Sequence, residues 1–308
     1  MLIKSHAPVR VDFAGAWTDV PYFSDPFTGA TLNAAIQIYV SGQMNDQERI
    51  EGSAADEEDG TPQPALSVRY QSNVPAGSGL GTSAALNVVW LSLARRTPVE
   101  TVEDKMYIAA LAYDIEKVLG IIGGKQDQYA SAIGGINLFE FDPEEVRRYP
   151  VEISAESIRQ LEDLLVLCYT GKPRLSSNIH RNVWDNFRAG NETTVRALFR
   201  LRDTAYEAKE CLEGGDLEHF GELLSVQFDC ARQLDNSTTN EQIEELFELA
   251  DPMIIGGKAC GAGGGGCLLF LARSPEEARQ LAEELRQRQL TVLDLKFDFN
   301  GLVLDIGQ

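Results

Sequence analysis

The sequence is poor in the residue types that build metal clusters, disulfide frameworks and basic surfaces. Its 308 residues include three histidines and five cysteines, scattered and without a Cys-x-x-Cys pair, so we expect reduced core cysteines and no metal cluster. Lys and Arg number only 27 against 47 Asp and Glu. The resulting net charge of −20 argues against nucleic acid or an anionic membrane as a partner.

Long apolar segments are also missing. The beginning of the sequence lacks the apolar region of a signal peptide, and no apolar run reaches the ~18 residues of a membrane span. These features predict a cytoplasmic enzyme that acts on a small molecule. The sequence leaves open whether it is a monomer or a homodimer.

Patterns typical of strands and of helices occur in both halves of the chain, which indicates an α+β fold. The pattern changes near residue 155, so we place a boundary there between domains 1–155 and 156–308. The second domain is expected to contain helices at about 178–213, 216–234 and 239–250, and to close with strands 291–297 and 302–306.

The most distinctive stretch is the glycine-rich segment 74–86. Three alternating glycines precede Thr82 and Ser83, after which apolar residues continue as a helix. A glycine loop before a helix N-terminus presents backbone amides to an anion, so the segment predicts a phosphate site. Thr82 and Ser83 would occupy the N-cap and the first turn. Taken alone, the segment could equally be a capped glycine turn.

Two common nucleotide-binding motifs do not fit. The segment 77–82 lacks the last glycine of the dinucleotide fingerprint G-x-G-x-x-G. Lys125 and Lys258 each follow a glycine, but Gln126 and Ala259 stand where a P-loop has Ser or Thr. A Rossmann oxidoreductase and a P-loop ATPase are therefore disfavoured.

Three separated segments together resemble the GHMP kinases, a family named for galactokinase, homoserine kinase, mevalonate kinase and phosphomevalonate kinase. Residues 74–86 resemble its phosphate loop, 7–19 its N-terminal motif and 258–270 its C-terminal glycine motif. The resemblance implies a two-domain fold, with a mixed βα N-terminal domain and a ferredoxin-like C-terminal domain. It also implies ATP and Mg²⁺ as cofactors.

Within the family, segments 123–137 and 18–23 are most similar to kinases of the D-glycero-D-manno-heptose 7-phosphate type, which act on an anomeric hydroxyl. Trp17 departs from that type and is similar to the fucokinases. The favoured function is therefore phosphorylation of a heptose 7-phosphate or a related sugar. The alternatives are a kinase of an unphosphorylated sugar, such as fucose or a uronic acid, and a non-catalytic sugar sensor.

The resemblance also implies residue roles. Asp127 would be the base, Arg10 would pair with it, and Lys125 would supply charge to the transferred phosphoryl group. Ser83 and Glu116 would be the Mg²⁺ ligands. The nucleotide phosphates would lie on Pro75, Gly77, Ser78, Gly79, Leu80, Gly81, Thr82 and Ser83. The sugar would contact Trp17, Thr18, Asp19, Arg174, Ser176, Ser177, Gly263 and Gly264.

Each of these roles has a plain structural alternative. Glu116 could be a solvated helix glutamate, and Asp127 could cap the helix that follows it. Segment 174–177 could be an ordinary loop, and the glycines of 261–265 could serve only close loop packing.

Overall fold

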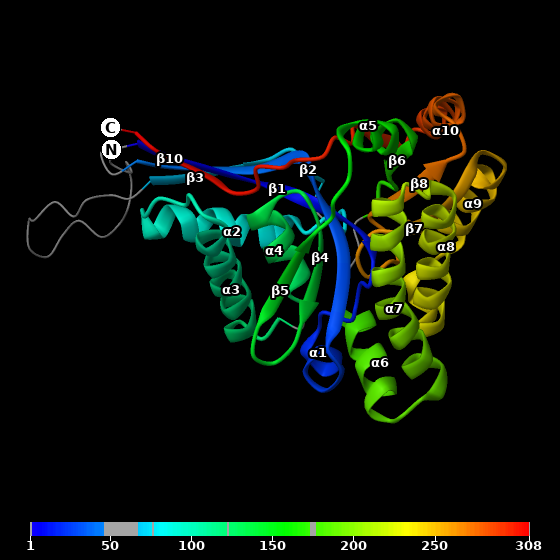
Figure 1. The fold of residues 1–308 in the computed structure, drawn as a ribbon, viewed down its shortest axis with the longest axis horizontal. Coiled ribbons are helices and arrows are strands. Elements are labelled where there is room, and N and C mark those ends of the chain that lie inside the picture. Colours follow the sequence, from blue (N-terminus) through cyan, green and yellow to red (C-terminus); the bar gives the residue numbers. More distant parts are fainter. Residues whose placement is uncertain (1, 46–66, 76, 122, 173–176, 308) are drawn as a thin grey trace, which may run out of the picture.

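The computed structural model describes residues 2–45, 67–75, 77–121, 123–172 and 177–307. Two antiparallel sheets, each accompanied by helices, follow one another along the molecule (Figure 1). This arrangement confirms the expected α+β class.

The first sheet has the strand order β10-β1-β2-β4-β5, and β3 pairs with β2. Its centre is the long pair of β1 and β2, in which alternate β1 residues such as Ile3, Val11 and Phe13 are completely buried. From Ala7 to Ala14 every β1 residue is buried, so this part of the strand is covered on both faces. The strands are β1 (Leu2–Ala14), β2 (Gly29–Asn45), β3 (Ser67–Ser72), β4 (Ile136–Phe141), β5 (Val146–Pro150) and β10 (Val303–Ile306).

Helices α2 and α4 pack on β1 and β2, and α3 packs on both helices (Figure 1). Thr101 and Asp104 form a capping box at the start of α3. The N-cap of α2 is Gly81, however, with a φ of 74°, so Thr82 is the first helical residue. The helices of this half are α1 (Pro21–Phe27), α2 (Thr82–Arg95), α3 (Val102–Val118) and α4 (Gln126–Ile133).

The second sheet has the order β7-β8-β6-β9. Along the chain, β6 is followed by helices, the hairpin β7–β8, helix α10 and β9, which is the ferredoxin-like arrangement expected. Its strands are β6 (Leu165–Tyr169), β7 (Ile254–Ala259), β8 (Cys267–Ala272) and β9 (Thr291–Leu293). The accompanying helices are α5 (Ala155–Leu164), α6 (Ser177–Arg188), α7 (Glu192–Gly214), α8 (Leu217–Leu234), α9 (Glu241–Ala250) and α10 (Pro275–Gln287), with the 3₁₀ turns η1 (Asn236–Thr238) and η2 (Asp251–Met253).

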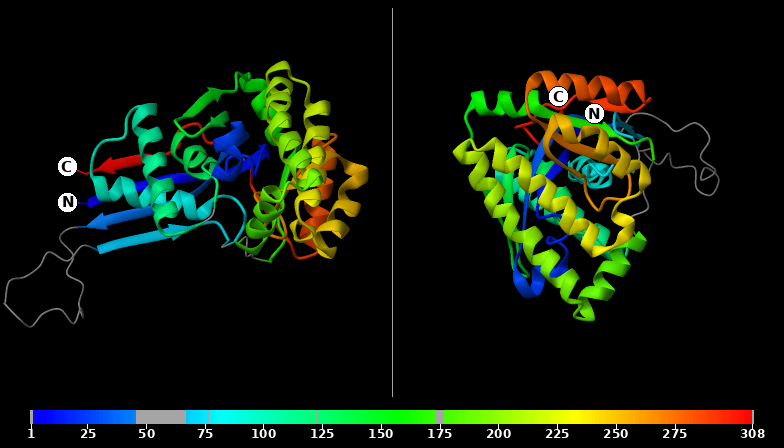
Figure 2. Two further views of the ribbon diagram at one scale, coloured as in Figure 1. Left: turned by 90° about the horizontal axis from the view of Figure 1, so that it is seen from below. Right: turned by 90° about the vertical axis from the view of Figure 1, so that its right-hand side faces the viewer.

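The largest of three hydrophobic clusters among the described residues extends through both halves. Helices α7 and α8 run side by side (Figure 2), with α7 against β1 and β2 and α8 against β7. Phe13 of β1 meets Phe220 of α8 edge to face, with ring centroids 5.2 Å apart. Because this cluster contains side chains from both halves, the two halves are packed directly against each other.

Two details of the second half differ from the sequence prediction. The expected helix 178–213 is interrupted between α6 and α7, where Gly190 has a φ of 71° that breaks a helix. The last strand does not close the second sheet, because β10 returns to pair with β1. The end of the chain thus lies in the sheet of the first half, and a single cut at residue 155 does not separate the two sheets.

All five cysteines are buried and reduced, as the sequence predicts. Among the described residues, no helix is both long and apolar enough to cross a membrane.

Candidate active site

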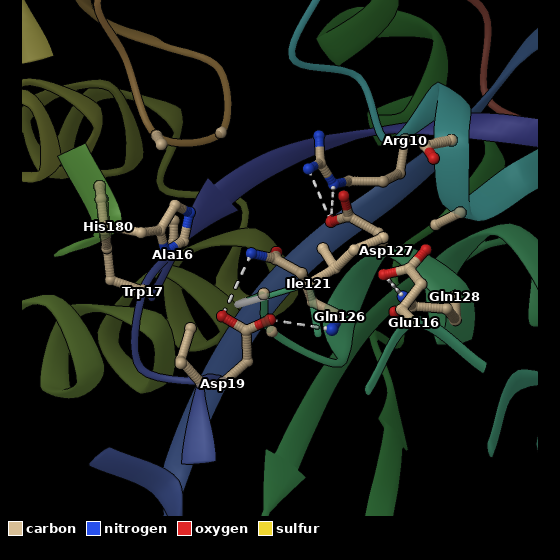
Figure 3. Close-up of a pocket in the computed structure, with 17 residues that line it drawn as sticks. Arg10, Ala16, Trp17, Asp19, Glu116, Ile121, Gln126, Asp127, Gln128 and His180 are labelled. Carbon is tan, nitrogen blue, oxygen red and sulfur yellow. Dashed lines mark hydrogen bonds and ion pairs between the residues drawn. The ribbon is translucent and has the colours of Figure 1, made fainter. Parts of the chain in front are cut away.

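A cavity of about 220 Å³ lies where the two halves meet (Figure 3). The first half contributes β1, the loop that follows it, and the start of α2. It also contributes the end of α3 and the start of α4. From the second half come His180 of α6 and the glycine loop after β7, at Gly261 and Ala262. The three sequence segments that resemble one family therefore converge on one cavity.

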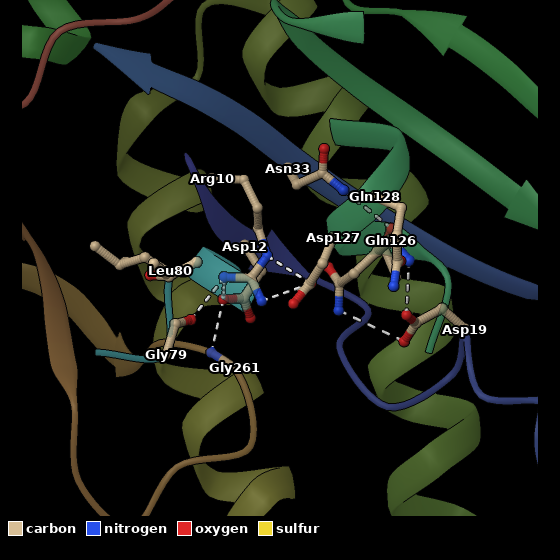
Figure 4. A network of polar contacts seen from close by, with 12 residues as sticks. Arg10, Asp12, Asp19, Asn33, Gly79, Leu80, Gln126, Asp127, Gln128 and Gly261 are labelled. Atoms are coloured by element: carbon tan, nitrogen blue, oxygen red, sulfur yellow. Dashed lines mark hydrogen bonds and ion pairs between the residues drawn. The ribbon is translucent and has the colours of Figure 1, made fainter. Parts of the chain in front are cut away.

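Arg10 and Asp127, which both line the cavity, form an ion pair (Figure 4). Nε and Nη2 of Arg10 lie 2.8 and 2.6 Å from Oδ1 of Asp127. Arg10 is 3% exposed and Asp127 is 30% exposed. The carboxylate therefore reaches the cavity, and the buried guanidinium holds it in place. Asp127 stands in the first turn of α4 but does not cap it, because the N-cap is Lys125.

The glycine loop before α2 is held beside this ion pair. Arg10 donates from Nη1 to the Gly79 carbonyl at 2.7 Å, and Cys267 donates from its backbone N–H to the Ser78 carbonyl at 2.7 Å. A Cβ added at Gly81 would lie 3.2 Å from Cγ and Oδ2 of Asp127. The helix N-terminus and the carboxylate are thus immediate neighbours, which suits an anion bound next to an acidic group.

Glu116 of α3 lines the same cavity as Ser83 of α2. Its two carboxylate oxygens accept hydrogen bonds of 2.8 Å from the side-chain amides of Asn87 and Gln128. Burial, together with the charge of Asp127, raises the pKa of Glu116 to about 7. The carboxylate is therefore fixed in position, and no positive charge of the described residues compensates it.

Asp19 follows β1 and is 2% exposed. It accepts a hydrogen bond of 2.9 Å from the backbone N–H of Gln126, and an added Cβ at Gly124 would lie 1.8 Å from its Oδ2. The glycine is therefore required for this close approach. Burial raises the pKa of Asp19 to about 7, and the charge of Asp127 acts in the same direction.

Among the described residues no three His, Cys, Asp or Glu side chains are placed to hold a metal ion together, but the cavity offers oxygen ligands for a hard divalent cation. Asp19, Glu116 and Asp127 all line it, and among the described lining residues Arg10 carries the one fixed positive charge. Mg²⁺ prefers oxygen ligands and takes few of them from protein. The Glu116 carboxylate and the Ser83 hydroxyl fit this requirement, and a cation there would offset the carboxylate charge that raises the pKa of Glu116.

The rest of the cavity wall is formed by aromatic rings and by side chains with buried polar atoms. Trp17 stacks obliquely on His180, with ring centroids 4.6 Å apart, and both line the cavity. Buried Nε1 of Trp17 and buried Oε1 of Gln126 and Gln128 find no hydrogen-bond partner among the described residues. A buried polar atom without a partner is costly, so these atoms suit a ligand rich in hydroxyl groups.

Several residues expected at the sugar or the phosphate lie elsewhere. The Thr18 hydroxyl is buried and bonds the Gly15 and Ala30 carbonyls at 2.8 and 2.9 Å, so it fastens the loop after β1 instead of lining the cavity. Lys125 donates to the Asp142 carbonyl at 3.1 Å and does not line the cavity.

The C-terminal glycine loop also contributes differently from the expectation. Gly263 and Gly264 pack on η1, where an added Cβ on either residue would lie 2.4 Å from a backbone oxygen. Gly261 and Ala262 line the cavity in their place. Arg174 and Ser176 are outside the described residues, as is the side chain of Ser177 at the start of α6.

Sequence reasoning missed His180, the two glutamines beside Asp127, and Asp12 and Lys258. Asp12 is completely buried and accepts hydrogen bonds from Lys258 and from the Gly261 N–H. A signal for Asp12 was available, because a second charged residue two positions after Arg10 is unusual in a buried strand. No local signal marks His180, which the fold brings across the cleft from α6.

Comparison with known proteins agrees with this geometry. The family model for the N-terminal domain of GHMP kinases matches residues 30–135, and the model for their C-terminal domain matches residues 208–290. The chain is 30% identical to the D-glycero-alpha-D-manno-heptose 7-phosphate kinase of Campylobacter jejuni, over 97% of this chain and 98% of that protein.

Two further similarities concern a fucokinase and a solved structure. The chain is 30% identical to the bifunctional fucokinase/GDP-fucose pyrophosphorylase of Arabidopsis thaliana, over 92% of this chain but only 31% of that longer protein. The crystal structure of a D-glycero-D-manno-heptose 1-phosphate kinase from Bacteroides thetaiotaomicron superposes with a TM-score of 0.75 at 23% identity, covering 99% of each chain. That superposition establishes the fold.

Proposed function

Because the chain belongs to the GHMP kinases and is an ATP-dependent sugar kinase, we propose that it phosphorylates the anomeric hydroxyl of a heptose 7-phosphate or a closely related sugar. The observation that carries this proposal is the Asp127 carboxylate, paired with Arg10 and next to the N-terminus of α2. The full-length similarity to a heptose 7-phosphate kinase supports the choice of sugar.

The proposed reaction needs a proton acceptor and an anion site side by side. We assign the acceptor role to Asp127, whose Oδ1 is held by Arg10 while Oδ2 faces the start of α2. The sugar hydroxyl would donate its proton to Oδ2 as its oxygen bonds to the terminal phosphorus of ATP, and the bond from that phosphorus to the bridging oxygen would break to release ADP. The amides of segment 77–83 and the dipole of α2 would hold the phosphates.

We assign metal binding to Ser83 and Glu116, whose oxygens line the cavity on the α2 side. Mg²⁺ bound there would neutralise charge on the transferred phosphoryl group. Asn87 and Gln128 fix both oxygens of Glu116, so the carboxylate is oriented before any metal arrives.

We assign sugar binding to Asp19, Trp17 and His180. Asp19 would accept hydrogen bonds from sugar hydroxyls, and the indole of Trp17 would cover an apolar face of the ring. The buried amide oxygens of Gln126 and Gln128, which no described residue satisfies, would take further hydroxyl groups. Arg174, Ser176 and Ser177 stay predictions for the far end of the substrate.

A second candidate is a sugar without a phosphate, such as fucose or a uronic acid. It is favoured by the charge of the cavity, because among the described lining residues Arg10 is the fixed cation and Asp127 already engages it. A non-catalytic sensor is disfavoured by the joint presence of Ser83, Glu116 and Asp127 around one cavity.

The test is a panel of free and phosphorylated heptoses and hexoses incubated with ATP and Mg²⁺. Phosphorus NMR identifies a product phosphorylated at the anomeric carbon, and ADP release measures turnover. The proposal expects the highest kcat/KM for a heptose 7-phosphate. A higher value for a free sugar would establish the second candidate, and sugar binding without ADP release would establish the sensor.

A further inference from the structure

Asp12 connects the two halves of the molecule directly beneath the cavity. Its Oδ2 pairs with the Lys258 ammonium, which also donates to the Asp12 carbonyl at 2.7 Å. Its Oδ1 accepts the Gly261 N–H at 2.7 Å and lies 3.6 Å from Nη1 of Arg10 (Figure 4). One buried carboxylate therefore touches β1, β7 and the C-terminal glycine loop.

Arg10 stands between two carboxylates that compete for it. Asp127 receives its Nε and Nη2 at 2.8 and 2.6 Å, whereas Asp12 approaches only to 3.6 Å. Asp12 is fully buried and Asp127 is partly exposed, so an uncompensated Asp12 would attract the guanidinium more strongly than Asp127 does. The Lys258 ammonium, 4% exposed, removes that competition by neutralising Asp12.

The pKa of Asp12 depends on the same two cations, Lys258 and Arg10. Burial by itself would raise the pKa of Asp12, but the charges of Lys258 and then Arg10 outweigh it and lower the pKa. Asp12 is therefore a charged group in the folded protein. A buried charge of this kind must be paired, and Lys258 is its closest partner.

We propose that Lys258 is a positioning residue for the phosphoryl transfer: by neutralising Asp12 it keeps the Arg10 guanidinium on Asp127. This inference rests on the proposed function, since it gives Asp127 the role of base. Through the bond from Gly261 to Asp12, the same contact fixes the part of the glycine loop that lines the cavity. Lys258 itself does not line the cavity, so its effect must pass through Asp12 to Arg10 and to the glycine loop.

The test compares Lys258→Met, which leaves Asp12 charged, with Asp12→Asn/Lys258→Met, which removes both charges. Lys258→Met is expected to lower kcat about 100-fold with the KM for ATP changed less than about 3-fold, since the base is misplaced but the phosphate loop remains. The double variant should recover kcat to within about 10-fold of the wild type, because no carboxylate then competes for Arg10. Lys296→Met, which breaks an ion pair with Glu162 away from the cavity, is the matched control and should leave kcat unchanged.

Circular dichroism at the assay temperature confirms that each variant is folded, so that stability does not enter kcat. If Lys258→Met fails to fold, the kcat of the folded double variant is the deciding measurement. A folded double variant that loses about 100-fold in kcat would overturn the proposal, as would a folded Lys258→Met with wild-type kcat.

Crystal structures give a readout that does not depend on the substrate. In Lys258→Met, Arg10 should form a hydrogen bond to Asp12 and lose at least one of its two bonds to Asp127. Unchanged Arg10–Asp127 geometry would overturn the positioning role even if no sugar is turned over. An inactive wild type with the expected rearrangement would instead refute the proposed function and leave the charge relationship standing.

Discussion

Two nitrogens of Arg10 converge on a single oxygen of Asp127, at 2.8 and 2.6 Å. Within the described part of the chain, no residue forms a hydrogen bond with the other oxygen, Oδ2, which lies on the side of Gly81. The carboxylate is therefore oriented through one oxygen and left able to accept a proton through the other. This division is what general base catalysis by a carboxylate requires.

The first prediction concerns the base itself. Asp127→Asn keeps an oxygen for Arg10 but cannot accept a proton, so kcat should fall by about 10³-fold. ATP affinity, measured by calorimetry, should stay within about 3-fold of the wild type, because the loop contacts of Arg10 to Gly79 persist. Turnover at the wild-type rate would remove Asp127 from the role of base.

The second prediction uses the close approach of Gly81 to Asp127. Gly81→Ala places a methyl group 3.2 Å from Oδ2 at a φ of 74°, and should lower kcat about 100-fold by displacing the carboxylate. Gly215→Ala is the matched control, because Gly215 has the same φ of 74° and nothing within 4 Å of an added Cβ.

Both glycine variants should lose about 1–2 kcal/mol of stability from the left-handed backbone, as measured by urea denaturation. Only Gly81→Ala should lose activity. Equal kcat values for the two variants would show that the spacing between α2 and Asp127 does not matter for turnover.

The third prediction is a pH dependence of metal binding. With a pKa of about 7, Glu116 is mainly protonated at pH 6 and mainly ionised at pH 8. A metal binds only the ionised form, so the Mg²⁺ concentration for half-maximal turnover should be about 10-fold higher at pH 6 than at pH 8. Glu116→Gln should need more Mg²⁺ at both pH values, and the concentration for half-maximal turnover should be the same at pH 6 and pH 8. A ratio in the variant equal to that in the wild type would exclude Glu116 as the titrating ligand.

The local motifs of the sequence predict much of the site. Asp19, Ser83, Glu116 and Asp127 each belong to a short segment with its own signature, and the fold brings all of them to one cavity. Two of the predicted site residues do not line the cavity, and in each the side chain has a choice of direction. Thr18 turns inward to the Ala30 carbonyl and Lys125 turns outward to Asp142, and neither motif encodes that choice.

Contacts between the two halves could not be predicted from the sequence, because they join segments that lie far apart in the chain. His180 and Lys258 reach the site through the packing of α6 and β7, which depends on tertiary contacts more than 160 residues apart in the chain. The return of β10 to β1 is of the same kind, since pairing of the last strand with the first has no local signal. Periodicity specifies an element but not its neighbour in the sheet.

The last prediction concerns Asp19, which is costly to the folded protein in its ionised form. Burial and the charge of Asp127 raise its pKa to about 7, against about 3.9 in an unfolded chain. Between these values the native state holds a proton that the unfolded state has released, so this group makes stability fall as the pH rises through about 4 to 7. Asp19→Asn removes the titration and can still accept the Gln126 N–H through its side-chain oxygen.

The gain in the free energy of unfolding from Asp19→Asn should therefore be about 2 kcal/mol larger at pH 8.5 than at pH 5.5, measured by urea denaturation. Glu116 titrates in the same range in both proteins, so its contribution cancels in the difference. The stabilised variant should bind sugar at least about 10-fold more weakly, because a neutral amide replaces a charged acceptor. A pH-independent gain would show that Asp19 is ionised in the folded wild type over this whole pH range, so that its pKa is not raised. A gain with unchanged sugar affinity would place the sugar hydroxyls elsewhere in the cavity.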